Sequence, residues 1–227
     1  MAEDSAGRPP DAAPAPSQNL AGAPPPRATA GAGALRLAVL ILAALAAAGC
    51  TTAVDLGGGV RQHGDHIFTY EGPELEAALT TRQAESSLGD EWLVLAVELR
   101  STSRSGPVTV SRSDVSVRTP DGRRLALVDQ DTYRTNFGRV RVAVERAVTA
   151  LPTLGRFDTA QMPCDRWFLT DPFSGFAYDD VYINTFQSCR GPLVFFDSGG
   201  IQPGRWRLLI ELEESTADIP FEVEAPE

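Results

Sequence analysis

The sequence of 227 residues contains no lysine, so all 20 of its basic residues are arginine. With 30 acidic residues the formal net charge is −10, whereas a nucleic-acid-binding protein needs clustered positive charge. Histidine, with 2 residues, and cysteine, with 3, are also scarce, and no glycine-rich phosphate loop is present. We therefore expect no nucleic-acid partner, no metal and no cofactor.

Long hydrophobic runs are lacking as well. The main apolar run, residues 37–48, is too short for a bilayer core of about 30 Å, which requires about 20 helical residues. Arg36 precedes this run, and Gly49 and Cys50 follow it, which is typical of a secretory signal. We predict a signal peptide at 35–49. The Ala- and Pro-rich residues 1–34 predict a disordered leader.

Residues 47–50, Ala-Ala-Gly-Cys, resemble the lipobox of bacterial lipoproteins, in which a cysteine is lipidated and becomes the new N-terminus. The resemblance implies that Cys50 carries diacylglycerol and palmitate and anchors the protein to a membrane of the cell envelope. In two-membrane bacteria an aspartate after the cysteine often retains such proteins in the inner membrane. Thr51 stands there instead, so the outer membrane is expected if the host has one.

Cys164 and Cys189 then remain as a pair in an exported domain, and oxidising compartments favour a disulfide between them. A metal site would need more ligands nearby, and a redox pair would normally show Cys-x-x-Cys spacing. We predict a structural disulfide that closes a long loop.

Alternation of apolar and polar residues dominates the rest of the chain. In residues 92–100 and 205–213 apolar side chains occupy every second position, which is typical of half-buried strands. Residues 120–122, Pro-Asp-Gly, predict a turn between strands 113–118 and 123–128. The pattern predicts a mainly β, immunoglobulin-like sandwich over residues 63–227, preceded by a flexible tether at 50–62.

One segment departs from this alternation. Apolar residues at helical spacing predict one short helix over 139–151, which Pro152 ends. The helix belongs to an insertion at 131–190. The long loop that follows the helix is rich in aromatic residues, and long ordered loops often carry function. Four of them are candidates for a binding surface: Trp167, Phe173, Tyr178 and Tyr182. The preferred interpretation of residues 152–191 is nevertheless a lid packed over one sheet edge and pinned by the disulfide.

The order of strands and turns in residues 89–103, 107–115 and 119–123 is similar to that of telokin-like, immunoglobulin-type domains of exported bacterial lipoproteins. The resemblance covers roughly residues 65–130 and 190–225. It implies a fold and an export context, and it implies no activity.

Candidate catalytic residues occur at 197–200, Asp-Ser-Gly-Gly, because Asp-Ser-Gly occurs in aspartic and trypsin-like proteases. An aspartic protease needs a second copy, and a serine protease needs a general-base histidine, whereas His63 and His66 lack any surrounding motif. We therefore predict a hairpin turn at Asp197 and Ser198. His63 and His66, with Asp65 between them, could hold a metal, but a solvated tether is the preferred interpretation.

Three functions are compatible with these observations. The first is a lipid-anchored module that binds an envelope protein through its sandwich and is not an enzyme. The second is a periplasmic carrier of a small ligand, with residues 131–190 as a lid. The third is an envelope hydrolase that uses Asp197 or Ser198.

Overall fold

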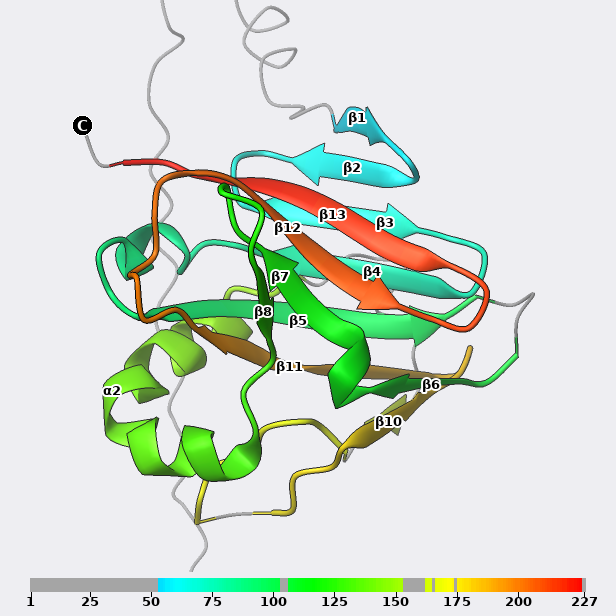
Figure 1. The fold of residues 1–227 in the computed structure, drawn as a ribbon. Helices are drawn as coiled ribbons and strands as arrows, with labels where there is room; N and C mark the ends of the chain where they lie inside the picture. Colours follow the sequence, from blue (N-terminus) through cyan, green and yellow to red (C-terminus); the bar gives the residue numbers. More distant parts are fainter. Residues whose placement is uncertain (1–52, 103–105, 153–161, 165, 174, 226–227) are drawn as a thin grey trace, which may run out of the picture. The chain divides into compact units, whose positions relative to one another are not determined.

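The computed structural model describes residues 53–102, 106–152, 162–164, 166–173 and 175–225. Of the described residues, 48% lie in strands and 17% in helices, which confirms the prediction of a mainly β protein. Two mainly antiparallel sheets pack face to face, and the helix α2 (Gln130–Thr149) lies against the larger one (Figure 1). The predicted leader, the signal peptide and Cys50 lie outside the described residues.

The larger sheet has seven strands in the order β1-β2-β3-β4-β5-β11-β9. Neighbouring strands are antiparallel, except that β9 and β11 are parallel. The strands are β1 (Val54–Gly57), β2 (Val60–His63), β3 (Ile67–Glu71), β4 (Leu75–Thr80), β5 (Trp92–Ser101), β11 (Gln187–Phe196) and β9 (Met162–Pro163).

The smaller sheet has four strands in the order β13-β12-β7-β8. They are β13 (Thr216–Val223), β12 (Gly204–Glu211), β7 (Val115–Arg118) and β8 (Arg124–Ala126). The predicted alternation in β12 is confirmed, because Trp206, Leu208 and Ile210 are buried while Arg205 and Arg207 are exposed. The predicted turn at 120–122 joins β7 to β8.

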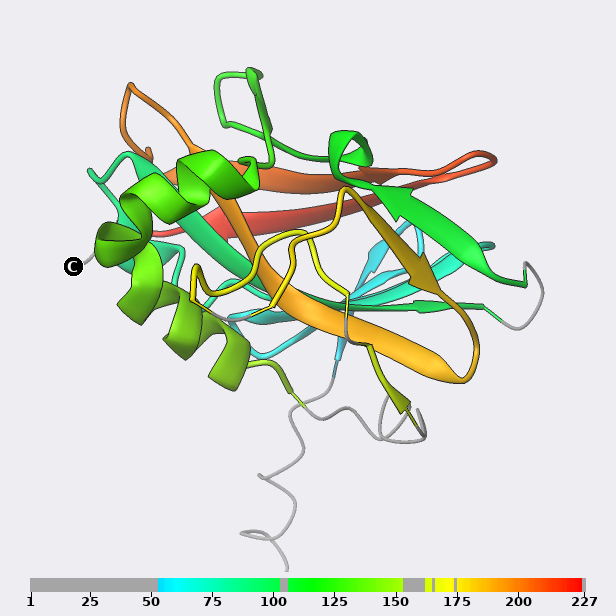
Figure 2. The same ribbon diagram turned by 90° about the horizontal axis from the view of Figure 1, so that it is seen from below.

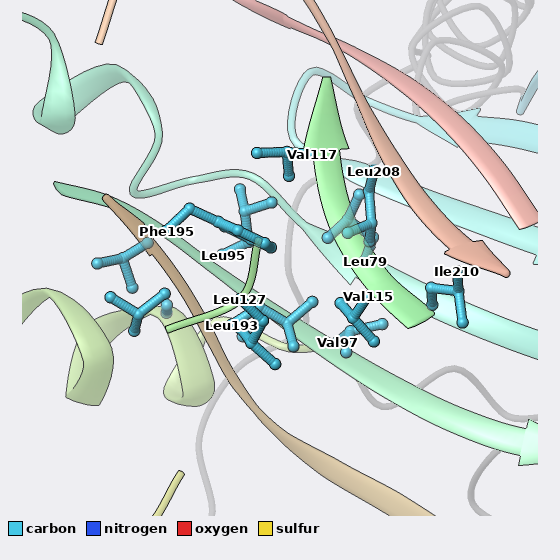
Figure 3. Packing of buried hydrophobic residues seen from close by; sticks show 14 of the residues in the cluster. Leu79, Leu95, Val97, Val115, Val117, Leu127, Leu193, Phe195, Leu208 and Ile210 are labelled. Atoms are coloured by element: carbon cyan, nitrogen blue, oxygen red, sulfur yellow. The ribbon is translucent and has the colours of Figure 1, made fainter. Parts of the chain in front are cut away.

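The core lies between these sheets. Figure 3 shows Val115 and Val117 of β7 and Leu208 of β12 packing toward Leu95 of β5 and Phe195 of β11. All five side chains are at most 1% exposed. Removing this much apolar surface from water is the main stabilising contribution to such a fold.

The helix is longer than predicted and begins earlier. It was expected over 139–151, but α2 spans Gln130–Thr149, and Asp129 caps its N-terminus by accepting a hydrogen bond from the Thr132 N–H at 2.7 Å. Figure 2 shows α2 running beside β11, and it contacts both β5 and β11. Two short 3-10 helices complete the helical elements of the described chain: η2 (Glu85–Ser87) and η3 (Arg112–Asp114).

The strand β5 is consequently buried on both faces. Leu93 and Leu95 face the smaller sheet side of the core, while Val94 lies with Val140 and Ala143 of α2. The sequence predicted a half-buried strand, and this is wrong for β5 because α2 covers its second face.

Residues 54–63 correct the prediction of a flexible tether at 50–62. They form β1 and β2, which pair as an antiparallel hairpin and continue into β3. Gly58, in the turn of this hairpin, has a φ of 60°, which glycine adopts without steric cost. The triple glycine therefore makes a turn within the sheet.

The expected insertion at 131–190 is also corrected, since it is built into the fold. Besides α2 it supplies β9, the start of β11, and β10 (Asp180–Ile183). β10 pairs with β6 (Val108–Ser111) in a separate two-stranded sheet. The segment is therefore not a lid attached to a finished sandwich.

Residues 197–200 form a turn, but not the predicted hairpin. β11 pairs with β5 in the larger sheet, whereas β12 pairs with β7 and β13 in the smaller one. The turn therefore carries the chain from one sheet to the other, and the C-terminal hairpin is β12–β13.

The predicted disulfide between Cys164 and Cys189 is confirmed, with the two Cα atoms 4.6 Å apart. Cys189 lies on β11 opposite Leu99 of β5 and is fully buried. The Cys164 N–H also donates to the Ser188 carbonyl at 3.2 Å. The disulfide and this hydrogen bond together hold the end of β9 beside β11 at the edge of the sheet.

Removing this bond lowers stability. We expect the double variant Cys164→Ala/Cys189→Ala to lose about 3.5 kcal/mol of unfolding free energy, because the unfolded chain regains the entropy of an open loop. Urea denaturation measures this. Wild-type protein treated with reductant should match the variant, and equal stability of the oxidised and fully reduced forms would contradict the expectation.

Candidate functional site

One arginine holds together the segments that carry the candidate residues. Arg112, in η3, donates through Nη1 to the Val128 carbonyl at 2.8 Å. Its Nη2 donates to the carbonyls of Phe168 at 2.7 Å and Tyr178 at 3.3 Å. Its Nε pairs with Asp179 Oδ1 at 2.9 Å. We call this set the Arg112 clamp. It joins β6, the approach to α2 and the loop before β10.

The position of Arg112 follows from local sequence. Ser111 and Asp114 form a reciprocal capping box around η3, with the Ser111 N–H donating to Asp114 Oδ2 at 2.8 Å. The Ser111 hydroxyl also donates to Asp180 Oδ1 at 2.6 Å, and the Arg112 N–H donates to the Asp179 carbonyl at 2.7 Å. These bonds fix η3 against the start of β10.

A second connection ties the same loop to α2. The Gln130 side chain donates to the Thr170 carbonyl at 2.9 Å and accepts from the Thr170 N–H at 3.2 Å. The loop beside the helix is therefore held at both Phe168 and Thr170.

Trp167 was a candidate surface residue, and the structure corrects this. Its side chain is buried, its Nε1 donates to the Pro192 carbonyl at 2.8 Å, and its ring lies 5.1 Å from that of Phe168. A Cβ at Gly191 would come within 2.2 Å of Trp167 Nε1, so this contact requires glycine there. Trp167 is thus a packing residue.

The other aromatic residues lie nearer the surface. Phe173 is 92% exposed and Tyr182, on β10, is 54% exposed. Tyr178 is partly buried, and the Arg166 guanidinium lies 5.0 Å from the centre of its ring. Two further residues, not among the candidates, are Phe176 at 81% and Phe186 at 71%. We call Phe173, Phe176, Tyr182 and Phe186 the aromatic surface.

A groove lies between α2 and the loop that follows Trp167. Its volume is about 370 Å³, and its apolar lining comes from Phe137, Val144 and Val148 of α2 together with Leu169 and Pro192. We call it the α2 groove. Tyr133 also lines it, although only 2% of that residue is exposed.

Asp197 has a structural setting. Both carboxylate oxygens accept hydrogen bonds from Arg123, each at 2.8 Å, and Oδ1 also accepts from the Gly199 N–H at 3.0 Å. The side chain is 1% exposed, and the bonds from Arg123 lower the pKa of Asp197. This bidentate pair fixes the turn between the sheets to the β7–β8 turn, and the geometry lends no support to the hydrolase alternative.

The two histidines lie at the β2–β3 hairpin. His63 Nε2 is 3.0 Å from Thr69 Oγ1, and His66 Nδ1 is 3.8 Å from Glu85 Oε1. Within the described residues, no group of three or more His, Cys, Asp or Glu is placed to hold a metal ion. In the same part of the chain no helix combines the length and hydropathy needed to cross a membrane.

Comparisons with known proteins return no matching family model, no similar curated protein and no similar solved structure. The resemblance to telokin-like domains, and the lipidation of Cys50, therefore stay predictions.

Sequence reasoning missed Arg112 and Tyr133. The partners of Arg112 are mostly backbone carbonyls, which leave no side-chain pattern to recognise. Tyr133 precedes the residues assigned to the helix, and the signal that could have found it is Asp129, an N-cap residue one position before α2.

We expect Arg112→Ala to lower the free energy of unfolding by about 3 kcal/mol, because carbonyls in three segments lose a charged donor. Arg112→Lys should recover only part of this, since an ammonium lacks the planar fork. Arg134→Ala, which breaks an exposed pair on α2, is the matched control and should change little. Urea denaturation tests this, and wild-type stability of Arg112→Lys would refute the clamp.

Asp197 makes stability depend on pH. Because its pKa is lowered in the folded protein, its contribution is complete above the ordinary carboxyl pKa of about 3.9 and is lost as pH falls through the folded value. Asp197→Asn should therefore be less stable than wild type at neutral pH, with a gap that narrows below about pH 4. Denaturation across pH measures the gap. Asp131→Asn, at an exposed pair, is the control, and a constant gap for Asp197→Asn would count against the assignment.

Proposed function

We propose that the protein is a lipid-anchored binding module of the bacterial cell envelope that contacts a partner protein through the aromatic surface. The observation that carries this proposal is the exposure of four large aromatic side chains on a stretch that is otherwise firmly attached. Contiguous exposed apolar groups mark interaction sites and aromatic residues are enriched at protein interfaces, and we propose that these four side chains act as one contact surface.

The attachment of this stretch supports a preorganised surface. Phe168, Tyr178 and Asp179 are held by the Arg112 clamp, Asp180 accepts from the Ser111 hydroxyl, and β10 is paired with β6. Because little backbone freedom remains to be lost, a partner that covers these rings meets a low ordering cost.

The direction of the anchor favours a protein partner over the anchoring membrane. Cys50 precedes Val54 by four residues, which span at most about 14 Å. β1 and β11 are separated by five strand spacings in the sheet, or about 24 Å. Figure 1 shows β1 and β10 at opposite ends of the domain. A lipid on Cys50 would reach β1 more readily than β11, which favours a protein over the anchoring membrane as the partner of the aromatic surface.

The α2 groove favours a second candidate function, the carriage of a small ligand. Its volume of about 370 Å³ falls within the range of ligand pockets, and its walls come from α2, the loop at Leu169 and Asp171, and Pro192 of β11.

Photocrosslinking in the native host tests the first proposal. Phe173 is replaced by a photoreactive phenylalanine analogue, which should yield a protein adduct because the side chain meets the partner directly. Val142, at 47% exposure on α2, carries the same analogue as the matched control and should yield none.

Three results bear on the proposal. A protein adduct at position 173 that disappears in Phe176→Ser/Phe186→Ser supports it. A lipid adduct at 173, or equal adducts at 173 and 142, contradicts it. Cys50→Ser tests the anchor separately, since loss of lipidation should release the protein from membrane fractions and mass spectrometry should find no diacylated N-terminus.

A further inference from the structure

The hydroxyl of Tyr133 has no hydrogen-bond partner among the described residues, although the side chain is almost wholly buried along the α2 groove. Its ring packs edge-on against Phe137, with the centroids 5.5 Å apart. Within the described residues, the wholly buried side-chain polar atom without a partner is Trp92 Nε1, so the Tyr133 oxygen keeps access to the groove. A phenol oxygen that the protein leaves unpaired and that opens on a mostly apolar groove is a polar contact available to a ligand.

The charges around the groove determine which ligand fits. Arg141 and Glu145 are one helical turn apart on α2, 3.5 Å from each other, and largely cancel. Asp171 accepts the Phe173 N–H at 2.9 Å and is paired with no cation among the described residues. Burial, and after it the charges of Asp171 and Glu145, raise the pKa of Tyr133 to about 12, so the hydroxyl stays protonated.

We propose that the α2 groove binds a small apolar molecule that carries an amine or ammonium group. The apolar body lies against Phe137, Val144 and Leu169. The ammonium group donates a hydrogen bond to the Tyr133 oxygen and is attracted by the carboxylate of Asp171. One cationic group therefore supplies a partner to both side chains. An anionic group is disfavoured, because it would meet the carboxylate of Asp171.

The walls of the groove are fixed before any ligand arrives. The Gln130–Thr170 pair holds the loop to the start of α2. Near the end of α2, the Arg190 side chain donates to the Val148 carbonyl at 3.2 Å and holds the helix to β11. Such a preformed concave site is the usual form of a small-molecule pocket. The inference rests on the carrier candidate and is independent of the aromatic surface.

The test uses three probes of one shape: benzylammonium, benzyl alcohol and benzoate. The full chain is placed in lipid nanodiscs, with empty nanodiscs as the blank, and affinities are measured by ligand-observed NMR. Because Asp171 is exposed, we expect benzylammonium to bind about 5-fold more tightly than benzyl alcohol, with benzoate the weakest.

Two variants assign the effect to residues. Asp171→Asn keeps the oxygen that accepts the Phe173 N–H and should remove most of the preference for benzylammonium over benzyl alcohol. Tyr133→Phe should weaken benzylammonium binding about 5-fold while leaving the unfolding midpoint unchanged, because its hydroxyl makes no hydrogen bond within the described chain. Phe173→Ser, on the aromatic surface, is the control and should bind as wild type does.

The outcomes separate the two levels of the inference. If none of the probes binds, the carrier candidate and the ligand class both fail. If the probes bind without a charge preference, or benzoate binds most tightly, the carrier candidate survives and the amine ligand is refuted. Binding that is insensitive to Tyr133→Phe and to Asp171→Asn places the probes elsewhere and also refutes the inference.

Discussion

The structure on the α2 side of the protein depends on a single guanidinium. Arg112 supplies hydrogen bonds to the carbonyls of Val128, Phe168 and Tyr178, which come from three separate turns of chain. None of these carbonyls belongs to a strand pair or a helix, so without Arg112 they would compete poorly for partners in a partly dry region. Together with the Gln130–Thr170 pair, this residue places the start of α2 and the loop that forms the wall of its groove.

The two faces of β5 pack against different elements, which explains how the domain has both a large buried core and a concave, partly apolar surface. One face packs into the sandwich core, where Leu95 meets side chains of β7 and β12. The other face is covered by a helix, which is narrower than a sheet and so leaves grooves along its flanks. The sandwich therefore provides most of the buried apolar area, while the helix side provides concave and exposed features that a ligand or partner can use.

Periodicity predicted the strands well, since β12 shows the same alternation in sequence and in burial. The disulfide was also predictable, because once Cys50 is assigned to the predicted lipobox the other two cysteines allow only one pairing. The tether was wrong because glycines at 57–59 are equally suited to a linker and to a hairpin turn, and only pairing with β3 distinguishes them. The groove could not be predicted, because it arises where α2 meets a loop whose backbone carbonyls accept hydrogen bonds from the Arg112 and Gln130 side chains. Such contacts to backbone leave no pattern in the sequence of the loop.

Asp171 belongs to both of the surfaces on this side. One of its oxygens accepts the Phe173 N–H and so fixes the turn that exposes that ring, while the residue also lines the α2 groove. A change that removes the oxygen, such as alanine, would alter the groove and the aromatic surface at once. Asparagine keeps the acceptor and removes only the charge, so it separates electrostatics in the groove from the shape of the loop. The two functions can therefore be distinguished by chemistry at one residue, even though they share a segment of chain.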